Sequence, residues 1–465
     1  MTGQGLRIEP RSAYRAVLAV GLLIVLGANL PGHLSYDSVA QLYEGHFHVR
    51  ETWGPALYAW ILGFFDRFVP GTALYVTTSG VLFFGVLATF SDLRPRTTWL
   101  AALVAALAIA TPQVLIYQAI VWKDVCFANT AIAGFICVAH AGRIWPRATR
   151  RWLLVAAAVL LMAIGSQVRQ NGILAALIGG VGLGWIAAAQ GLRRSWLARW
   201  RTGALWAVGF TLAVAVVGHF MTAWSVPPRS PADPGLKPGL RIVQNYDLVA
   251  AAALDPHYRL DIMAAADPTD TAMVLKRAPL EYSGRRVDFI DRDEALSDAI
   301  TRISDDAAGK QWIDLVTKHT GLYLRARIED FRWLVAPPVI DWCLPVYLGV
   351  DAPMEKMTPL KLQRRYTQAD VELNNYSSWF LDTPVYSHLF YAGLSLVLAG
   401  LFLWRRQPAD MMLAAMQLAG VAHMASFFII SIACDYRYLY FTDLAAIVGL
   451  IYAAVDPPMP WRRKT

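Results

Sequence analysis

Ten apolar runs limit what this chain of 465 residues can fold into more than any other feature of its sequence. They lie at about residues 14–30, 73–90, 98–112, 125–141, 152–165, 172–190, 203–224, 385–404, 409–431 and 438–455. Helices of roughly 17–25 apolar residues are long enough to cross the hydrocarbon core of a bilayer. Charged residues make up 16% of the chain, whereas soluble proteins average about 25%. The sequence therefore predicts an all-α polytopic membrane protein with about ten transmembrane helices.

The positions of the basic residues predict which end of each helix faces the cytoplasm. Short loops inside the cell carry an excess of Lys and Arg, whereas the opposite loops carry few. With the N-terminus inside, the opposite loops hold Lys123, Arg169 and Arg437. The inner segments then hold Arg7, Arg11, Arg15, Arg94, Arg96, Arg143, Arg147, Arg150, Arg151, Arg193, Arg194, Arg199, Arg201, Arg405, Arg406, Arg462, Arg463 and Lys464. This asymmetry, together with the apolar runs, indicates a multi-pass protein of a bacterial inner (plasma) membrane. The net charge of +8 is not by itself a sign of nucleic-acid binding, and no nucleic-acid partner is expected.

One apolar run, residues 55–70, is short and ends at Pro70 and Gly71. Counting it as an eleventh span would put Arg94 and Arg96 outside and reverse every later loop. We therefore expect an interfacial or re-entrant helix, which this length permits. The first outer loop is then about 31–72, with two helices along the membrane surface.

The distribution of apolar runs divides the chain into three regions. Residues 1–224 are expected to form an N-terminal transmembrane module, 225–384 an extracytoplasmic domain, and 385–465 the last transmembrane helices. The middle region opens with a Pro- and Gly-rich connector at 225–239, which is typical of loops. Within it, residues 312–335 have the spacing of an amphipathic helix. Three of its basic residues are expected to face lipid headgroups: Arg325, Arg327 and Arg332.

Charged residues follow the ends of the predicted spans at four separate places on the outer side. The first outer loop contains Asp37, and also Glu44, His46, His48 and Arg50; the others are "WKD" (122–124), "RQN" (169–171) and "CDYRYLY" (434–440). Ionisable groups at membrane depth are costly and tend to face a cavity or one another. We therefore expect these groups to line one pocket at the outer rim of the bundle. Its cations suit a lipid-linked phosphate, and a carboxylate beside them suits proton abstraction from a hydroxyl.

In these features the sequence resembles the GT-C superfamily of polytopic glycosyltransferases, which use polyprenyl-phosphate-linked sugars. The resemblance consists of "SYDS" after the first span, a first outer loop with two surface helices, "WKD", "RQNG" and the "YRY" that opens the last span. It covers most of residues 1–224 and 385–455. It implies an inverting transfer with Asp37 as the catalytic base. It implies phosphate recognition by Lys123, Arg169 and Arg437. From their positions at the outer rim, further residues are expected to bind substrate: Asp124, Asn171, Tyr436, His46, His48 and Arg50.

The resemblance also implies the ligands and partners. The donor is a polyprenyl-phosphate sugar, the acceptor is a glycan, a lipid or a protein, and the bilayer surrounds both. No cofactor is expected, and with no DxD motif in the first outer loop no divalent metal is expected to be required. The four cysteines, Cys126, Cys137, Cys343 and Cys434, have no paired spacing, which argues against a zinc site or a disulfide scaffold.

Other interpretations of the same residues stay open at the level of sequence. Ser35 or Asp37 is a possible helix N-cap, Lys123 and Asp124 a possible local ion pair, and Arg169 a possible snorkelling side chain. "DRD" (291–293) matches a metal-binding pattern but is expected on a solvated helix face. For the whole protein, a transporter or flippase of lipid-linked glycans and a membrane ligase or acyltransferase are the alternatives. No internal repeat supports transport, and no GxxxxGK[ST] motif supports an ATP-driven pump.

Overall fold

The computed structural model describes residues 9–457 except 53, 192–194, 228–236 and 287–288. Within these residues it is helical, with three isolated β-bridges and no extended strand. The all-α fold class predicted from the sequence is confirmed. Several predicted features lie outside the described residues, namely most of the connector and the basic residues Arg7, Arg193, Arg194, Arg462, Arg463 and Lys464.

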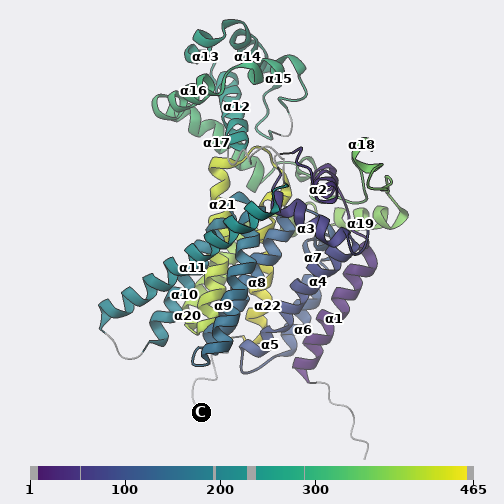
Figure 1. The fold of residues 1–465 in the computed structure, drawn as a ribbon, viewed down its shortest axis with the longest axis vertical. Helices are drawn as coiled ribbons and strands as arrows, with labels where there is room; N and C mark the ends of the chain where they lie inside the picture. Colours follow the sequence, from purple (N-terminus) through teal and green to yellow (C-terminus); the bar gives the residue numbers. More distant parts are fainter. Residues whose placement is uncertain (1–8, 53, 192–194, 228–236, 287–288, 458–465) are drawn as a thin grey trace, which may run out of the picture.

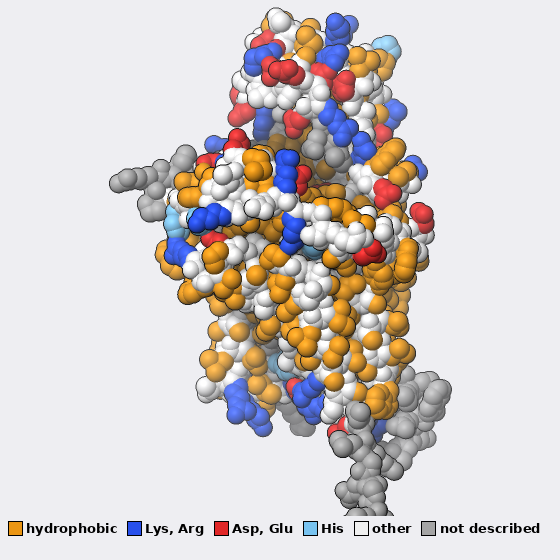
Figure 2. Space-filling model, turned by 90° about the vertical axis from the view of Figure 1, so that its right-hand side faces the viewer, with side chains coloured by type: hydrophobic (Ala, Val, Ile, Leu, Met, Phe, Trp, Pro, Cys, Tyr) orange, Lys and Arg blue, Asp and Glu red, His pale blue; other side chains and the backbone are white. Residues whose placement is uncertain are grey.

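Nine helical segments in the described part of the chain are long and apolar enough to cross a membrane. They are α1 (Pro10–Asn29), α4 (Ala73–Ala88) continued by α5 (Phe90–Leu93), α8 (Lys123–Arg143), α9 (Ala148–Val168), α10 (Ile173–Gln190), α11 (Trp196–Ser225), α20 (His388–Arg405), α21 (Pro408–Ile430) and α22 (Tyr440–Val455). Figure 1 shows them side by side in one bundle, in which α8 and α22 are the most buried. Figure 2 shows an apolar belt across the face of the bundle in view, with Lys and Arg side chains at its lower end.

One of the ten predicted spans, at residues 98–112, is broken. Residues 98–112 were expected to form one helix, but α6 (Trp99–Ile109) ends before Pro112, and the next helical segment, residues 112–119, is bent away by 75°. Proline lacks the N–H that would continue the helix and clashes with the preceding turn. The described part of the chain therefore has nine helices that could span a membrane, or ten if the bent pair counts as one.

The first outer loop contains two short helices, as predicted. They are α2 (Tyr36–Phe47) and α3 (Ala56–Asp66), and α3 is too short to span a bilayer at about 1.5 Å per residue. The two helices pack against each other where Gly45 meets Ala59 and Gly63. A β-carbon built on Gly45 would overlap the carbonyl oxygen of Ala59. This close approach fixes α2 on α3, and therefore fixes the position of the helix that carries Asp37.

The middle region has a hydrophobic core of its own above the bundle (Figure 1). It consists of α12 (Lys237–Leu254), α13 (Asp261–Ala266), α14 (Pro268–Glu281), α15 (Glu294–Arg302), α16 (Asp305–Lys318) and α17 (Thr320–Val335). A second part crosses the top of the bundle through η3 (Ile340–Cys343), α18 (Met354–Met357), α19 (Gln368–Ser378) and η4 (Pro384–Tyr386). The three-region division of the chain remains a proposal, and this separate core supports it.

Two expectations for this region were wrong. Residues 312–335 form two helices that meet at His319, and Arg327 is fully buried rather than at lipid headgroups. Arg327 pairs with Asp247 at 2.6 Å and with Asp330 at 3.4 Å, because a buried guanidinium needs carboxylate partners. Within "DRD", Asp293 is buried; it caps the N-terminus of α15 through the backbone N–H of Leu296 and pairs with Arg277.

The cysteine spacing argued against a disulfide scaffold, yet Cys343 and Cys434 form a disulfide across 91 residues of sequence. Their Cα atoms are 5.1 Å apart, within the usual range. Spacing gave no indication of this pair because its two members come from different regions that only the fold brings together. Cys126 and Cys137 remain free thiols within the bundle.

The contact between α2 and α3 predicts the effect of a single methyl group. Gly45→Ala should lower the stability of the protein by about 1–3 kcal/mol, because the added carbon meets backbone that cannot move aside. The matched control is Gly85→Ala in α4, where an added β-carbon meets nothing within 4 Å. The control should be neutral or stabilising by up to about 1 kcal/mol. Melting temperatures in detergent measure both, and equal values for the two variants would contradict the proposed contact.

Candidate functional site

The charged residues predicted at the outer rim come from the ends of four elements. Asp37 lies in the first turn of α2, whose N-cap is Ser35. Lys123 and Asp124 open α8, Arg169 is the C-cap residue of α9, and Arg437 lies in η5 (Tyr436–Leu439), just before α22. Each therefore sits where a helix begins or ends, and side chains of different helices can meet there.

Arg437 is held between two carboxylates. Its Nη2 lies 2.8 Å from Oδ2 of Asp37, and its Nε lies 2.7 Å from Oδ2 of Asp435. The guanidinium also lies 4.9 Å from the ring centroid of Trp122, a cation–π distance. The indole N–H of Trp122 donates to the hydroxyl of Ser35 at 2.8 Å, which links Arg437 back to the start of α2. Arg437 thus contacts the first outer loop directly through its ion pair with Asp37, and indirectly through Trp122, which binds Ser35.

A second ion pair lies beside the first. Arg169 Nη1 is 2.8 Å from Oδ1 of Asp124, and its guanidinium lies over the rings of Tyr438 and Phe427 at 4.8 and 5.2 Å. Lys123 connects the two pairs, since it is attracted by Asp124 and Asp37 and repelled by Arg169 and Arg437. Six charged residues therefore form one group, the rim cluster: Asp37, Lys123, Asp124, Arg169, Asp435 and Arg437. Its three formal positive charges balance its three formal negative ones.

The members of the rim cluster differ in their access to solvent. The Asp37 side chain is 47% exposed, whereas those of Arg437 and Asp435 are 14% exposed and that of Asp124 is 3% exposed. Burial raises the pKa of Asp435 to about 6, although Arg437 acts to lower it. An anion that takes the place of a carboxylate on Arg437 competes with Asp37 at Nη2 or with Asp435 at Nε. Asp37, as the exposed one, is the partner that such an anion would displace.

Other residues predicted to bind substrate have partners elsewhere. The side chain of Asn171 donates to the hydroxyl of Ser426 at 2.9 Å. The hydroxyl of Tyr436 is buried in the bundle, where it accepts from Gln113 at 2.8 Å and donates to Asp443 at 2.7 Å. The side-chain hydrogen bonds of both residues thus go to partners other than the rim cluster. Their roles in substrate binding stay predictions.

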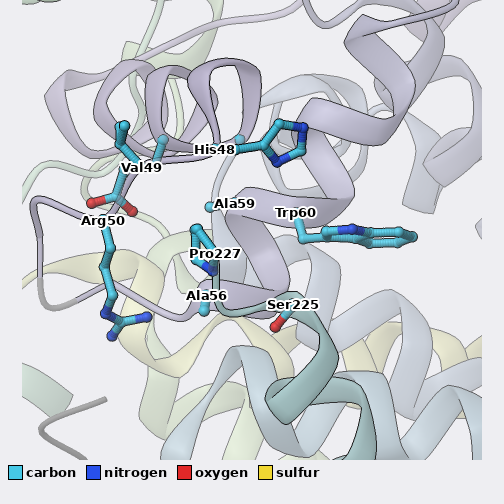
Figure 3. Close-up of a pocket in the computed structure, with 10 residues that line it drawn as sticks. His48, Val49, Arg50, Ala56, Ala59, Trp60, Ser225 and Pro227 are labelled. Carbon is cyan, nitrogen blue, oxygen red and sulfur yellow. The ribbon is translucent and has the colours of Figure 1, made fainter. Parts of the chain in front are cut away.

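The predicted residues His46, His48 and Arg50 lie at the far end of α2. His46 pairs with Asp66 at 2.5 Å, His48 contacts Arg67, and Arg50 donates to the carbonyl of Gly54 at 3.3 Å. In Figure 3, His48 and Arg50 border a small pocket between α2, α3 and the end of α11, with Trp60 pointing outward.

The carboxylate of Glu44 also lines this pocket. It accepts from the backbone N–H groups of Glu51 and Thr52 at 2.8 and 2.5 Å. Burial raises the pKa of Glu44, and the attraction of Arg50 acts in the opposite direction. The pocket is thus separate from the rim cluster, and its polar groups order the loop after α2.

Sequence reasoning missed several polar residues around the site. Asp443 pairs with His388 at 2.9 Å beneath Tyr436, and a carboxylate inside an apolar run is a signal that could have indicated it. His33 is buried, and its two ring nitrogens contact Asn29 and the backbone N–H of Gly349 at 2.9 and 3.0 Å. Burial lowers the pKa of His33 to about 4, so it is neutral near pH 7. No pattern around His33 could have indicated these partners, which lie more than 300 residues away in the case of Gly349.

No group of three or more His, Cys, Asp or Glu residues in the described part of the chain is arranged to hold a metal ion. The acidic residues of the rim cluster are each paired with a cation.

Comparison with known proteins gives a distant structural likeness. No protein-family model and no curated protein sequence matches the chain. One similar solved structure is the Archaeoglobus fulgidus oligosaccharyltransferase in complex with Zn and sulfate, with 12% identity and a TM-score of 0.41 over 94% of this chain and 48% of that one. Another is oligosaccharyltransferase AglB of the same organism with an inhibitory peptide and a dolichol-phosphate, with 13% identity and a TM-score of 0.40 over 95% of this chain and 50% of that one. The chain thus spans about half the length of these two solved proteins.

The raised pKa of Asp435 predicts a pH effect on stability. Its pKa is about 6 in the folded protein and about 3.9 in an unfolded chain. The neutral carboxyl therefore stabilises the fold below about pH 4, and this contribution is lost as the pH rises through 6. Between pH 4 and pH 7 the wild type should lose about 1–3 kcal/mol more stability than Asp435→Asn, which cannot ionise. Thermal unfolding in detergent at each pH tests this, and parallel pH profiles of the two proteins would contradict it.

Proposed function

We propose that the chain is an integral membrane glycosyltransferase of the GT-C type. In this proposal it transfers a sugar from a polyprenyl-phosphate donor to an acceptor hydroxyl on the extracytoplasmic face. The observation that carries the proposal is the 2.8 Å pair between Arg437 and the half-exposed carboxylate of Asp37. A cation suited to phosphate and a carboxylate suited to proton transfer thus lie in direct contact at one rim of the bundle.

The three cations of the rim cluster are the proposed phosphate site. A guanidinium binds phosphate through two parallel hydrogen bonds, whereas a Lys ammonium acts as a point charge. Arg437 and Arg169 are each oriented by an aromatic ring and a carboxylate, so little further ordering is needed when phosphate binds. The apolar belt beside the site is suited to a polyprenyl chain.

The proposed reaction is a single inverting displacement. Phosphate binding at Arg437 displaces Asp37, which becomes available as a base. The Asp37 carboxylate takes the proton of the acceptor hydroxyl, and the hydroxyl oxygen forms a bond to the anomeric carbon. The bond from that carbon to the phosphate oxygen breaks at the same time, and its electron pair leaves with the polyprenyl phosphate. Preorganised cations stabilise the charge that grows on the leaving phosphate.

Two observations support placing the proposed active site on the extracytoplasmic side of the membrane, which we take to be a bacterial inner membrane. Disulfides persist in oxidising compartments and are rare in the cytosol, and Cys434 of the Cys343–Cys434 disulfide directly precedes Asp435. The opposite end of the bundle carries the ion pairs of Arg11, Arg15 and Arg94, where the basic residues gather. That charge distribution follows the positive-inside rule.

The catalytic test is Asp37→Asn, which keeps the shape of the side chain but removes the base. Loss of a general base typically costs 10²–10⁴-fold, so we expect kcat to fall at least about 100-fold while the donor KM stays within about threefold. The measurement is transfer of radiolabelled sugar from a polyprenyl-phosphate donor by the purified protein in nanodiscs. Asp298→Asn is the control, since Asp298 is exposed in the outer domain away from the site.

Full transfer by Asp37→Asn would remove this residue as the base. Uptake of a glycan into vesicles by the wild type, without covalent transfer, would contradict the proposed enzyme and favour a transporter.

The proposed sidedness is tested by labelling introduced cysteines in intact cells. Asp298→Cys lies in the outer domain and Gln407→Cys at the opposite end of the bundle, each in a chain whose free Cys126 and Cys137 are replaced by Ser. A membrane-impermeant maleimide should label Asp298→Cys in whole cells and Gln407→Cys only after lysis. The reverse pattern would contradict the orientation.

A further inference from the structure

A segment of the middle region, residues 343–365, contacts both the Arg437 side and the Asp37 side of the rim cluster. We name it the strap. Its first residue, Cys343, is joined by the disulfide to Cys434, and Cys434 is followed directly by Asp435. Both cysteines are buried. One end of the strap is therefore fixed covalently to the short loop that carries Arg437.

Further along, the strap pairs with the backbone just before α2. The N–H of Leu34 donates to the carbonyl of Gly349 at 2.9 Å, and the N–H of Asp351 donates to the carbonyl of Leu34 at 3.1 Å. Val350 and Arg365 exchange two backbone hydrogen bonds, of 2.8 and 3.0 Å, which fold the strap back on itself. Leu34 lies three residues before Asp37, so the strap holds the start of the helix that carries the proposed base.

Side chains reinforce the same contacts. Arg365 Nη2 donates to the carbonyl of Gly32 at 2.8 Å, and the ring of Tyr347 lies 6.1 Å from that of Trp122, on which Arg437 rests. The N–H of Gly349 donates to the neutral ring of His33 at 3.0 Å. The strap therefore contacts the first outer loop, the Trp122 ring that lies against Arg437, and the loop before η5.

We propose that the strap and its Cys343–Cys434 disulfide position Asp37 against Arg437, so that sugar transfer depends on the oxidised state of this disulfide. This inference rests on the proposed function. Neither residue of the disulfide touches substrate, and both act through the backbone that carries the charged groups. A displacement of about 1 Å between reacting groups can cost about 100-fold in rate, so a loosened strap should lower kcat more than it alters donor binding.

Chemical reduction of the Cys343–Cys434 disulfide should loosen the strap without any mutation. A dithiol such as dithiothreitol supplies two electrons and two protons, which convert the disulfide into two thiols, while the dithiol becomes a cyclic disulfide. We expect reduction under denaturant-free conditions to lower the kcat of the wild type about 10- to 100-fold. Reoxidation should restore it.

The mutational test uses Cys343→Ser, Cys434→Ser and the double variant in the full chain in nanodiscs. Each single variant should lower kcat about 10- to 100-fold, with donor KM within about threefold. The double variant should match the singles, because the two residues act as one unit. Cys126→Ser and Cys137→Ser, which remove free thiols, are the controls and should keep the activity of the wild type.

A second variant disturbs the strap while leaving the disulfide intact, and keeps the proposal testable if the serine variants fail to fold. Gly349 has a φ of +80°, and an added β-carbon would overlap the carbonyl oxygen of Arg365. Gly349→Ala should therefore separate the strap from Leu34 and lower kcat as the serine variants do. Gly71→Ala is its matched control, since Gly71 has a φ of +88° but open space around it.

A readout that is independent of activity is amide hydrogen exchange. The N–H groups of Leu34, Val350 and Asp351 should exchange faster in Gly349→Ala and Cys434→Ser than in the wild type. Faster exchange together with the lower kcat supports the proposal. Wild-type kcat and exchange in the serine variants and in Gly349→Ala would overturn it. A wild type that transfers no sugar at all would instead overturn the proposed function, and the exchange data would still report whether the strap holds the loop.

Discussion

The ion pairs of Arg437 are the interaction on which the proposed site depends. A charged side chain at the depth of a membrane boundary is costly unless it has a partner, and Arg437 has two carboxylates and an aromatic ring. These partners come from α2, from the loop before η5 and from the residue before α8. The need to satisfy one cation therefore draws together three segments that are far apart in the sequence.

The opposite end of the bundle shows what distinguishes this group from an ordinary charge network. There Arg94 pairs with Asp410 at 3.2 Å and with Asp456 at 2.9 Å, and Asp410 is fully buried. That network joins the ends of α5, α21 and α22 and leaves no carboxylate as accessible as Asp37. Both ends obey the same rule of charge pairing, but the most exposed carboxylate that pairs with Arg94, Asp456, is 23% exposed, whereas Asp37 is 47% exposed. This difference in exposure is the physical basis for placing chemistry at the outer rim.

Hydropathy and charge were sufficient to predict the bundle, because apolar runs of membrane length and the bias of arginine between loops are local properties. They also predicted that Asp37 and Arg437 lie on the same rim. They could not predict the disulfide of Cys343 with Cys434, or the backbone pairing of Leu34 with Gly349, because both join regions whose separation in sequence carries no pattern. The break at Pro112 could have been predicted, because the sequence places a proline shortly after the apolar residues that form the short helix α6.

Burial was the property that sequence predicted least well. Arg327 has the spacing of an exposed residue on an amphipathic helix, yet the fold surrounds it with Asp247 and Asp330. Tyr436 adjoins Arg437 in sequence, yet its hydroxyl points into the bundle toward Asp443. Neighbouring residues in a short 3₁₀ helix face different directions. The side chains of a motif of adjacent residues therefore do not all lie in one site.

The most direct measurement of the central claim is an experimental structure of the protein with bound polyprenyl phosphate. We expect phosphate oxygens within about 3 Å of the guanidinium of Arg437, in the place that the carboxylate of Asp37 now occupies, with the Lys123 and Arg169 side chains beside them. Asp37 would then be released toward the solvent side of the site. Phosphate bound at a different place, with the pair between Asp37 and Arg437 still intact, would contradict it.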